Sequence, residues 1–447
     1  MYCKLSSFLV LGLKKSGYCA TKLLLEKGAV VYVYDQSPNE ISLKNLSELE
    51  LLGAKKVNES DLNSILNTID VLVLSPGVPI DNEIAILASK LNKRIIGELE
   101  LGSYFITSPI IGVTGTNGKT TVCSMLSHIL TLNNYENALV GNIGTPLTSK
   151  VDTITENTVC ITEVSSFQLE TTYRFLSHIS CILNVTPDHL ERHYNIENYA
   201  FLKGKLIYNL TKSEYAVLNY NDEIVKSLSE KTKGQIVWFS TTEKVNGAYL
   251  EDGNLVYNGE IICAANDLKL RGVHNIENYL AVIAILKLLG LETSQIKQGL
   301  ITFCGVKHRI QKIKEVNGIT FYNDSKSTNP DASIKAIESM DTKTVVILGG
   351  YDKGLDYTPL FNKIKENKKV ESVVLTGMTA NSMYKTATSV NVSNVYVVPN
   401  FNLAIRLSYL ISNQGYAVLF SPATSSFDMF SDYEERGERF IEIVNSL

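Results

Sequence analysis

The stretch that decides the fold reads IIGVTGTNGKTTVCSML and covers residues 110–126. It begins with the β-branched residues of a strand, turns at Gly115 and Gly118, and then takes the apolar spacing of a helix. Glycines in such a turn let backbone N–H groups surround phosphate oxygens, and the helix N-terminus adds positive potential. Lys119 can reach the β- and γ-phosphates, and Thr120 can bind Mg²⁺, so the stretch predicts a nucleotide-binding loop. The residues expected to bind ATP here are Gly115, Thr116, Asn117, Gly118, Lys119, Thr120 and Thr121.

Short apolar runs alternate with helical stretches on both sides of this loop. FLVLGL, AVVYVYD and DVLVLSPG precede it, NTVCITEVSS and HISCILNV follow it, and KTVVILGG, ESVVLTG and YAVLFSPA come near the end of the chain. This alternation is typical of parallel strands joined by crossover helices. We expect an α/β fold with three domains: a Rossmann-like domain over residues 1–95, a central P-loop domain with a parallel sheet over residues 96–299, and a Rossmann-like C-terminal domain over residues 300–447.

The composition excludes several classes of protein. The chain has 447 residues and a formal net charge of -4, so it offers no basic field for a nucleic acid polymer. Its seven cysteines are scattered without a CxxC pair, which is typical of reduced thiols in the cytosol. The first apolar run, FLVLGL, is too short for a signal peptide or a membrane span. We therefore expect a cytoplasmic protein without a membrane partner.

Residues that can bind a metal follow two of the apolar strands. Glu163 ends the run CITE, and Asp188 and His189 come just after ILNV. The carboxyl ends of neighbouring parallel strands converge on the crevice where α/β sheets bind ligands. Glu163 suits the Mg²⁺ ion that bridges the β- and γ-phosphates, and His189 suits a second metal ion.

A phosphate loop alone would fit a kinase, a GTPase or a ligase, but GTNGKTT resembles the ATP loop of the Mur ligase superfamily, which includes folylpolyglutamate synthase. The resemblance implies an ATP- and Mg²⁺-dependent amide ligase that activates a carboxylate as an acyl phosphate. It implies that Lys203 is carbamylated by CO₂, with Lys205 as the alternative, and that Asn142 in GNIG, residues 141–144, contacts substrate or phosphate. The implied catalytic residues are Lys119, Asn142, His189 and Lys203, and the implied metal ligands are Thr120, Glu163, His189 and Lys203.

The resemblance continues beyond the central loop. GVHNIENYLA, residues 272–281, implies that Asn275 and Asn278 lie near the nucleotide. Arg309 in KHR resembles the arginine that reaches the γ-phosphate. In NDSKSTNP, residues 323–330, the resemblance assigns Asp324 to the ribose or a metal-bound water, Lys326 to the nucleotide and Thr328 to the incoming amino acid.

The first domain distinguishes the branches of the family. GLKKSG, residues 12–17, follows one strand, and Asp35 ends the next, as in a dinucleotide fold. With SPGVP at residues 75–79 and GELEL at residues 97–101, it resembles the branch that adds D-glutamate to UDP-N-acetylmuramoyl-L-alanine for peptidoglycan synthesis, although Lys14 replaces that branch's usual glycine. The implied UDP-substrate residues are Leu13, Ser16, Asp35, Gln36, Ser75, Pro76, Gly77, Asn142 and Ser165.

The amino acid site of this branch would lie near the C-terminus. We find no DNPR-type motif of the branch that adds a diamino acid. The resemblance instead places Lys353, Ser426 and Phe427, together with Thr328, around the two carboxylates of D-glutamate. A cation, a hydroxyl and backbone N–H groups suit a dicarboxylate. The implied ligands are thus the UDP-sugar precursor, D-glutamate, ATP and two Mg²⁺ ions, all bound by a monomer.

Three alternatives remain at this point. Folylpolyglutamate synthase shares the ATP loop but lacks a separate UDP domain, which the first 95 residues supply. A nicotinamide-dependent oxidoreductase is suggested by the first glycine turn and Asp35, but it leaves the phosphate loop unexplained. A non-catalytic Mur-like subunit that binds nucleotide and a partner would not need the set Lys119, Glu163, His189 and Lys203.

Overall fold

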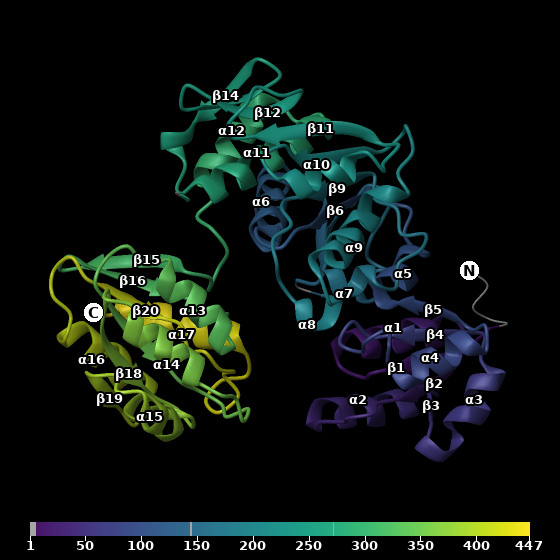
Figure 1. The fold of residues 1–447 in the computed structure, drawn as a ribbon, viewed down its shortest axis with the longest axis horizontal. Helices are drawn as coiled ribbons and strands as arrows, with labels where there is room; N and C mark the ends of the chain where they lie inside the picture. The colour runs from purple at the N-terminus through teal and green to yellow at the C-terminus, as the bar shows by residue number, and fades with distance from the viewer. Residues whose placement is uncertain (1–5, 144, 271) are drawn as a thin grey trace. The chain divides into compact units, whose positions relative to one another are not determined.

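A computed structural model describes residues 6–143, 145–270 and 272–447, so Gly144 of the GNIG segment lies outside the described residues. The contacts divide the chain into two compact units, Met1–Phe303 and Cys304–Leu447. Three β-sheets, each covered by helices, make up these units (Figure 1). Two of the sheets belong to the first unit and one to the second.

The first sheet is entirely parallel, with the strand order β3-β2-β1-β4-β5. Its alternate side chains face two helical layers: Phe8 and Val10 pack with α1 and α2, whereas Leu9 and Leu11 pack with α3 and α4. Burial on both faces explains why these strands read as continuous apolar runs. The elements are β1 (Ser7–Leu11), α1 (Lys15–Glu26), β2 (Val30–Tyr34), α2 (Glu40–Leu51), β3 (Lys55–Lys56), α3 (Leu62–Thr68), β4 (Val71–Leu74), α4 (Glu83–Lys90), β5 (Arg94–Gly97) and α5 (Glu98–Ser103).

The second sheet has nine strands in the order β14-β13-β12-β11-β10-β9-β6-β8-β7. Its strands are β6 (Ile110–Thr114), β7 (Asn137–Gly141), β8 (Val159–Glu163), β9 (Ile179–Ile182), β10 (Tyr215–Asn219), β11 (Gln235–Ser240), β12 (Gly247–Glu251), β13 (Asn254–Tyr257) and β14 (Glu260–Ala264). The sheet is parallel as far as β12, but β13 and β14 are antiparallel. Asp252-Gly253 and Asn258-Gly259 turn with positive φ at all four residues, which is the geometry of tight hairpins.

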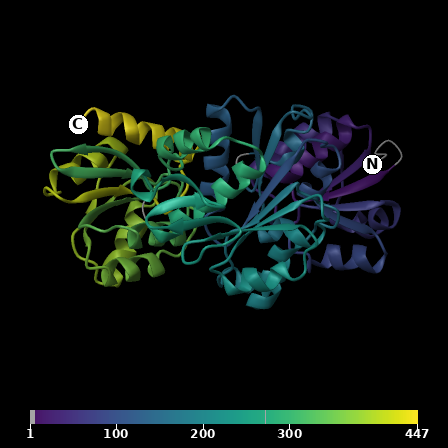
Figure 2. The ribbon, with the colours of Figure 1, turned by 90° about the horizontal axis from the view of Figure 1, so that it is seen from above.

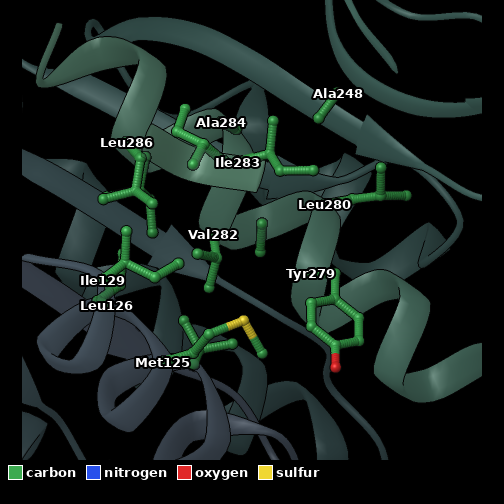
Figure 3. Packing of buried hydrophobic residues seen from close by; sticks show 14 of the residues in the cluster. Met125, Leu126, Ile129, Ala248, Tyr279, Leu280, Val282, Ile283, Ala284 and Leu286 are labelled. Carbon is green, nitrogen blue, oxygen red and sulfur yellow. The ribbon is translucent and has the colours of Figure 1, made fainter. Parts of the chain in front are cut away.

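The helices of this part are α6 (Lys119–Leu132), α7 (Ser166–Leu169), α8 (Leu190–His193), α9 (Ile196–Tyr208), α10 (Glu223–Ser229), α11 (Val273–Leu288) and α12 (Thr293–Thr302). On one face of the sheet, Met125 and Ile129 of α6 pack against Val282 and Leu286 of α11 (Figure 3). Fully burying each such side chain contributes roughly 1.5–3 kcal/mol. This packing fixes α6, and with it the turn at the N-terminus of α6. Short 3₁₀ helices occupy Glu59–Asp61, Leu147–Ser149 and Ala265–Asp267.

The second unit holds the third sheet, with the order β15-β16-β20-β17-β18-β19. β15 is antiparallel to β16, and the other neighbours are parallel. Val346 and Leu348 pack with α13, α14 and α15, whereas Val345 and Ile347 pack with α16 and α17, drawn in yellow-green and yellow in Figure 2. The elements are β15 (Gln311–Val316), β16 (Ile319–Asn323), α13 (Pro330–Glu338), β17 (Thr344–Leu348), α14 (Thr358–Glu366), β18 (Val370–Leu375), α15 (Ala380–Ser389), β19 (Val395–Val397), α16 (Phe401–Leu410), β20 (Ala417–Phe420) and α17 (Tyr433–Asn445).

The structure confirms the predicted α/β class with parallel sheets, and adds antiparallel strands to two of them. The predicted boundaries near residues 95 and 300 stay predictions. Within residues 6–143, 145–270 and 272–447, no helix combines the length and the apolar composition needed to cross a membrane.

The first glycine turn gives a test of the fold. Ala at position 17 would place its Cβ 1.8 Å from the carbonyl oxygen of Gly12, so the backbone must move. We expect Gly17→Ala to lower the free energy of unfolding by about 3 kcal/mol. Gly77→Ala is the control, because its Cβ would meet nothing within 4 Å, and its effect should stay within about 0.5 kcal/mol. Urea unfolding of both variants measures the difference, and equal stabilities would contradict this account.

Candidate functional site

The nucleotide loop lies between β6 and α6, as the sequence predicts. Gly115 and Gly118 have φ values of +156° and +86°, which favour glycine, and Gly118 is the N-cap of α6. The Lys119 Nζ atom donates hydrogen bonds to the carbonyl oxygens of Gly115 at 2.7 Å and Thr116 at 2.9 Å. The Lys119 side chain therefore lies over the loop that is expected to bind the phosphates.

Two predicted site residues, Thr120 and Asn142, converge on the buried carboxylate of a third, Glu163. Glu163 ends β8 and is 2% exposed. Its Oε2 atom accepts a hydrogen bond from the Thr120 hydroxyl at 2.9 Å, and its Oε1 atom accepts one from the Asn142 Nδ2 atom at 2.7 Å. The Asn142 backbone N–H also donates to the Glu163 carbonyl oxygen at 2.8 Å. Hard oxygen atoms from Thr120 and Glu163 at the phosphate loop fit Mg²⁺.

Asn184 is a residue of the site that the sequence analysis missed. Its Oδ1 atom accepts a hydrogen bond from the Asn117 N–H at 2.8 Å, and its carbonyl oxygen accepts one from the Thr116 N–H at 3.0 Å. The Thr116 hydroxyl also donates to the carbonyl oxygen of Thr186 at 3.1 Å. The segment after β9 thus holds the phosphate loop from the side. The sequence feature that could have identified Asn184 is a polar residue that follows the apolar run of a strand.

The two candidate lysines of α9 have different surroundings. Lys203 is 1% exposed, and its Nζ atom lies 4.4 Å from the centre of the Tyr199 ring. Burial, and next the charge of Lys119, lower the pKa of Lys203 to about 6, although Asp188 opposes this shift. Lys205 instead donates to the Glu170 carbonyl oxygen at 3.2 Å, and burial lowers its pKa as well. Lys203 is thus the candidate that lies near the phosphate-loop lysine.

His189 lies on a strained turn before α8. Its φ is +53°, and its Nε2 atom lies 3.7 Å from Asp188 Oδ2. Its ring centre is 4.9 Å from that of Phe167. In the part of the chain that the structure describes, no three His, Cys, Asp or Glu side chains are grouped so that they could hold a metal ion.

A cavity of about 480 Å³ in the first unit brings most predicted UDP-substrate residues together. Those that line it are Ser16, Asp35, Gln36, Ser75, Pro76, Gly77 and Asn142, along with Gly12, Lys14, Lys15 and Gln168. Leu13 and Ser165 are not among its lining residues. Leu13 donates its N–H to Asp35 Oδ2 at 2.8 Å, and Ser165 accepts the Gln168 N–H at 3.3 Å. Each is thus hydrogen-bonded to a residue that lines the cavity.

The nucleotide residues expected beyond the central loop are divided between the two units. In the first unit, a Cβ at Gly118 would lie 2.3 Å from Asn278 Oδ1, so Asn278 adjoins the loop, and the Asn278 Nδ2 atom donates to Asn275 Oδ1 at 3.4 Å. In the second unit, Asp324 is 1% exposed, whereas Arg309 is exposed. The Nζ atom of Lys326 lies 5.9 Å from the centre of the Tyr433 ring.

Asp324 joins several loops of the second unit. Its carboxylate accepts hydrogen bonds from the Ile310 N–H at 3.2 Å and from the hydroxyls of Ser327 at 2.5 Å and Ser421 at 2.6 Å. Burial raises the pKa of Asp324 to about 6, even though these bonds favour the ionised form. The carboxylate is therefore held in place before any ligand binds.

The expected amino acid residues also lie in the second unit. The Lys353 Nζ atom donates to the Thr328 carbonyl oxygen at 3.3 Å, which brings this pair together. Ser426 is buried, whereas Phe427 is exposed and its ring centre lies 6.2 Å from that of Tyr351. Within this set, the structure therefore brings Lys353 and Thr328 into contact.

Arg436 supports the loops of the second unit, and the sequence analysis did not identify it. It is 1% exposed on α17. Its guanidinium donates to the Ser325 hydroxyl at 3.0 Å, the Ser325 carbonyl at 2.9 Å and the Thr424 carbonyl at 3.0 Å. An arginine can be buried when its fork of donors is satisfied in this way. Arg436 thus connects the segment with Asp324 to the segment with Ser426.

Family models match all three parts of the chain. The Mur ligase MurD-like N-terminal domain matches residues 6–97, the Mur ligase middle domain matches residues 113–286, and the Mur ligase glutamate ligase domain matches residues 308–424. Among solved structures, MurF from Acinetobacter baumannii has a TM-score of 0.59 at 16% identity, covering 98% of this chain and 93% of its own. UDP-N-acetylmuramate-alanine ligase MurC from Thermotoga maritima has a TM-score of 0.55 at 20% identity, covering 99% of both chains. These two likenesses concern the fold.

Curated relatives match over nearly the full length. The UDP-N-acetylmuramoylalanine--D-glutamate ligase of Caldanaerobacter subterraneus is 40% identical over 442 residues, which are 98% of both chains. The proteins of the same name from Clostridioides difficile and Streptococcus pneumoniae serotype 19F are each 39% identical and cover 98% of this chain and 98% and 97% of their own. With the three family models and the shared fold, these matches show that the chain belongs to the Mur ligase family.

Proposed function

We propose that this chain is an ATP-dependent ligase that joins D-glutamate to UDP-N-acetylmuramoyl-L-alanine in peptidoglycan precursor synthesis. The observation that carries the proposal is the position of Asn142. This residue lines the 480 Å³ cavity, and its side chain also donates to Glu163, which accepts the Thr120 hydroxyl from the phosphate loop. A substrate in the cavity would therefore present its carboxylate beside the γ-phosphate of ATP.

The reaction then follows two displacement steps. The alanyl carboxylate of the substrate attacks the γ-phosphorus in line, which forms an acyl phosphate and releases ADP. The glutamate amine attacks the acyl carbon, the C–O bond to phosphate breaks, and an amide forms. Lys119 would exchange its carbonyl partners for phosphate oxygens and neutralise charge during transfer. Mg²⁺, when bound at Thr120 and Glu163, supplies further charge neutralisation at the phosphates.

Lys203 is proposed to carry a carbamate. Because the pKa of Lys203 is lowered to about 6, its amine is largely neutral at pH 7 and can attack CO₂. The amine nitrogen forms an N–C bond as one C=O π bond of CO₂ opens, and the nitrogen releases one proton, so a neutral amine becomes a carbamate anion. An anion beside Lys119 is electrostatically favourable where a second ammonium is not. With His189, this carbamate would serve a second Mg²⁺ ion.

We assign the remaining nucleotide and D-glutamate contacts to the residues predicted from the sequence. In the second unit we assign Arg309 to the γ-phosphate and Asp324 and Lys326 to the nucleotide, with Asn275 and Asn278 contributing from the first unit. The residues assigned to the carboxylates of D-glutamate are Thr328, Lys353, Ser426 and Phe427. The protein is proposed to act in the cytoplasm as a monomer on small molecules, not on a nucleic acid polymer or a membrane.

Phosphate release tests the assignment directly. The purified chain is given ATP, Mg²⁺ and UDP-N-acetylmuramoyl-L-alanine, and D-glutamate, L-glutamate, L-lysine and meso-diaminopimelate are added in turn. We expect sustained release with D-glutamate alone. Turnover only with a diamino acid would overturn the proposed branch, and no turnover with any of them would overturn the ligase assignment.

Removing the amine at position 203 tests the carbamate. We expect Lys203→Ala to lower kcat by about 100-fold, since a carboxylate that orients a metal is lost. The wild type should also lose activity in CO₂-free buffer and regain it on addition of bicarbonate, whereas Lys203→Ala should respond to neither. Lys205→Ala is the matched control on the same helix, and steady-state kinetics measure all three proteins. A dead Lys205→Ala beside an active Lys203→Ala would contradict the assignment.

Lys14 is proposed to contact the diphosphate of the UDP substrate, because it lines the cavity at the N-terminus of α1. Lys14→Ala should raise the KM for UDP-N-acetylmuramoyl-L-alanine about tenfold and leave kcat unchanged, since a charge-assisted contact is lost. Lys22→Ala removes the same charge from an exposed position of α1 and serves as the control. Kinetics at low ionic strength make the comparison, and equal KM values for the two variants would contradict a local contact.

A further inference from the structure

Arg192 of α8 contacts two separate parts of the first unit. Its Nη2 atom donates to the carbonyl oxygens of Pro76 at 3.3 Å and Val78 at 3.2 Å, which belong to the wall of the UDP-substrate cavity. Its Nε and Nη2 atoms also donate to the Glu170 carboxylate at 3.0 and 2.6 Å. The side chains of Arg192 and Glu170 are only 15% and 7% exposed, so this ion pair is largely shielded from water.

Tyr194 and His193, which follow Arg192, contact the same two parts of the first unit. The Tyr194 hydroxyl donates to Asp81 Oδ2 at 2.6 Å, on the segment that follows the cavity wall. The buried His193 ring lies 2.9 Å from the Ser166 hydroxyl through Nε2 and 3.5 Å from Glu170 Oε1 through Nδ1. Residues 188–194 are therefore joined to residues 75–82 on one side and to α7 on the other.

The same segment carries His189, the proposed metal ligand. The Phe167 ring contacts both His189 and Arg192. Its centre is 4.9 Å from the centre of the His189 ring and 4.8 Å from the Arg192 Cζ atom. A displacement of the Arg192 guanidinium would therefore disturb the ring against which His189 packs. The φ of His189, +53°, is costly for a residue with a side chain and needs such surrounding contacts.

We propose that Arg192 is a positioning residue that couples the UDP-substrate cavity to the segment that binds the second metal ion. Substrate seated against residues 75–78 fixes the carbonyl oxygens that hold the guanidinium, and the guanidinium fixes α8 and the ring of His189. Because coupling between two sites is reciprocal, Mg²⁺-nucleotide bound near His189 strengthens substrate binding by the same factor. This inference rests on the proposed function.

The coupling needs the geometry of an arginine. The Nε and Nη2 groups of the planar guanidinium hold three N–H donors in a rigid arrangement, so two of them pair with both oxygens of Glu170 while the third is shared between the carbonyl groups of Pro76 and Val78. The compact ammonium of lysine keeps the positive charge beside Glu170 but cannot make all four contacts. Arg192→Lys therefore separates the bridging role from the requirement for a charge partner.

The experiment measures binding without turnover. Isothermal titration calorimetry gives the Kd of UDP-N-acetylmuramoyl-L-alanine with and without Mg²⁺ and a non-hydrolysable ATP analogue, in the absence of D-glutamate. In the wild type we expect the ratio of the two Kd values to be about ten. In Arg192→Lys it should fall to within about twofold of unity. Arg174→Lys, an exposed arginine in the segment after α7, is the matched control and should keep the wild-type ratio.

The ratio of the two Kd values either supports or overturns the coupling. A ratio in Arg192→Lys equal to that of the wild type, or a wild-type ratio near unity, would overturn the coupling. If Arg192→Lys fails to fold in thermal melting, Tyr194→Phe replaces it, since it removes only the hydroxyl that donates to Asp81; an unchanged ratio there would also overturn it. Phosphate release by the wild type with D-glutamate is measured in parallel, so failure of the proposed function is recognised separately.

Discussion

The carboxylate of Glu163 is the point at which the phosphate loop and the substrate cavity meet. One oxygen accepts the Thr120 hydroxyl at the start of α6, and the other accepts the amide of Asn142 from the cavity wall. A carboxylate that is 2% exposed needs such donors, because an unpaired buried charge costs several kcal/mol. Because one buried carboxylate needs both donors, it holds the phosphate loop and the cavity wall in fixed relative positions. A change at either of these regions therefore acts on the other through the Glu163 side chain.

A second constraint concerns like charges. Lys119 and Lys203 are close enough for each ammonium to disfavour the other, and Lys203 is also buried. Burial and the charge of Lys119 outweigh the opposing charge of Asp188, so the pKa of Lys203 is lowered and its proton is released more readily. The cation of Lys119 stays available for phosphate, while the neutral amine of Lys203 becomes chemically reactive.

The sequence predicted those parts of the site that depend on local structure. Lys119 follows a glycine turn and Glu163 ends a strand, so strand and loop positions alone place them at one edge of the sheet. Asn184 and Arg436 depend on partners far along the chain: the Asn117 N–H is 67 residues from Asn184, and Ser325 is 111 residues from Arg436. No local pattern marks a helical arginine as buried. The antiparallel hairpins, in contrast, could have been predicted. Their turns are the dipeptides Asp252-Gly253 and Asn258-Gly259, which favour tight hairpins, but the sequence analysis predicted a parallel sheet only.

The short helix α8 shows how backbone strain can be maintained by binding contacts. His189, which is left-handed with φ +53°, and Tyr194, with φ +69° and ψ −44°, flank it in sparsely populated conformations, and each such residue costs roughly 1–3 kcal/mol. The contacts of Arg192 and Tyr194 with residues 76–81 offset that cost. These contacts end on the wall of the cavity, so the conformation of the segment that carries His189 depends on how firmly that wall is held. A rigid wall, such as one fixed by bound substrate, keeps the strained conformation populated, whereas a mobile wall lets the backbone relax.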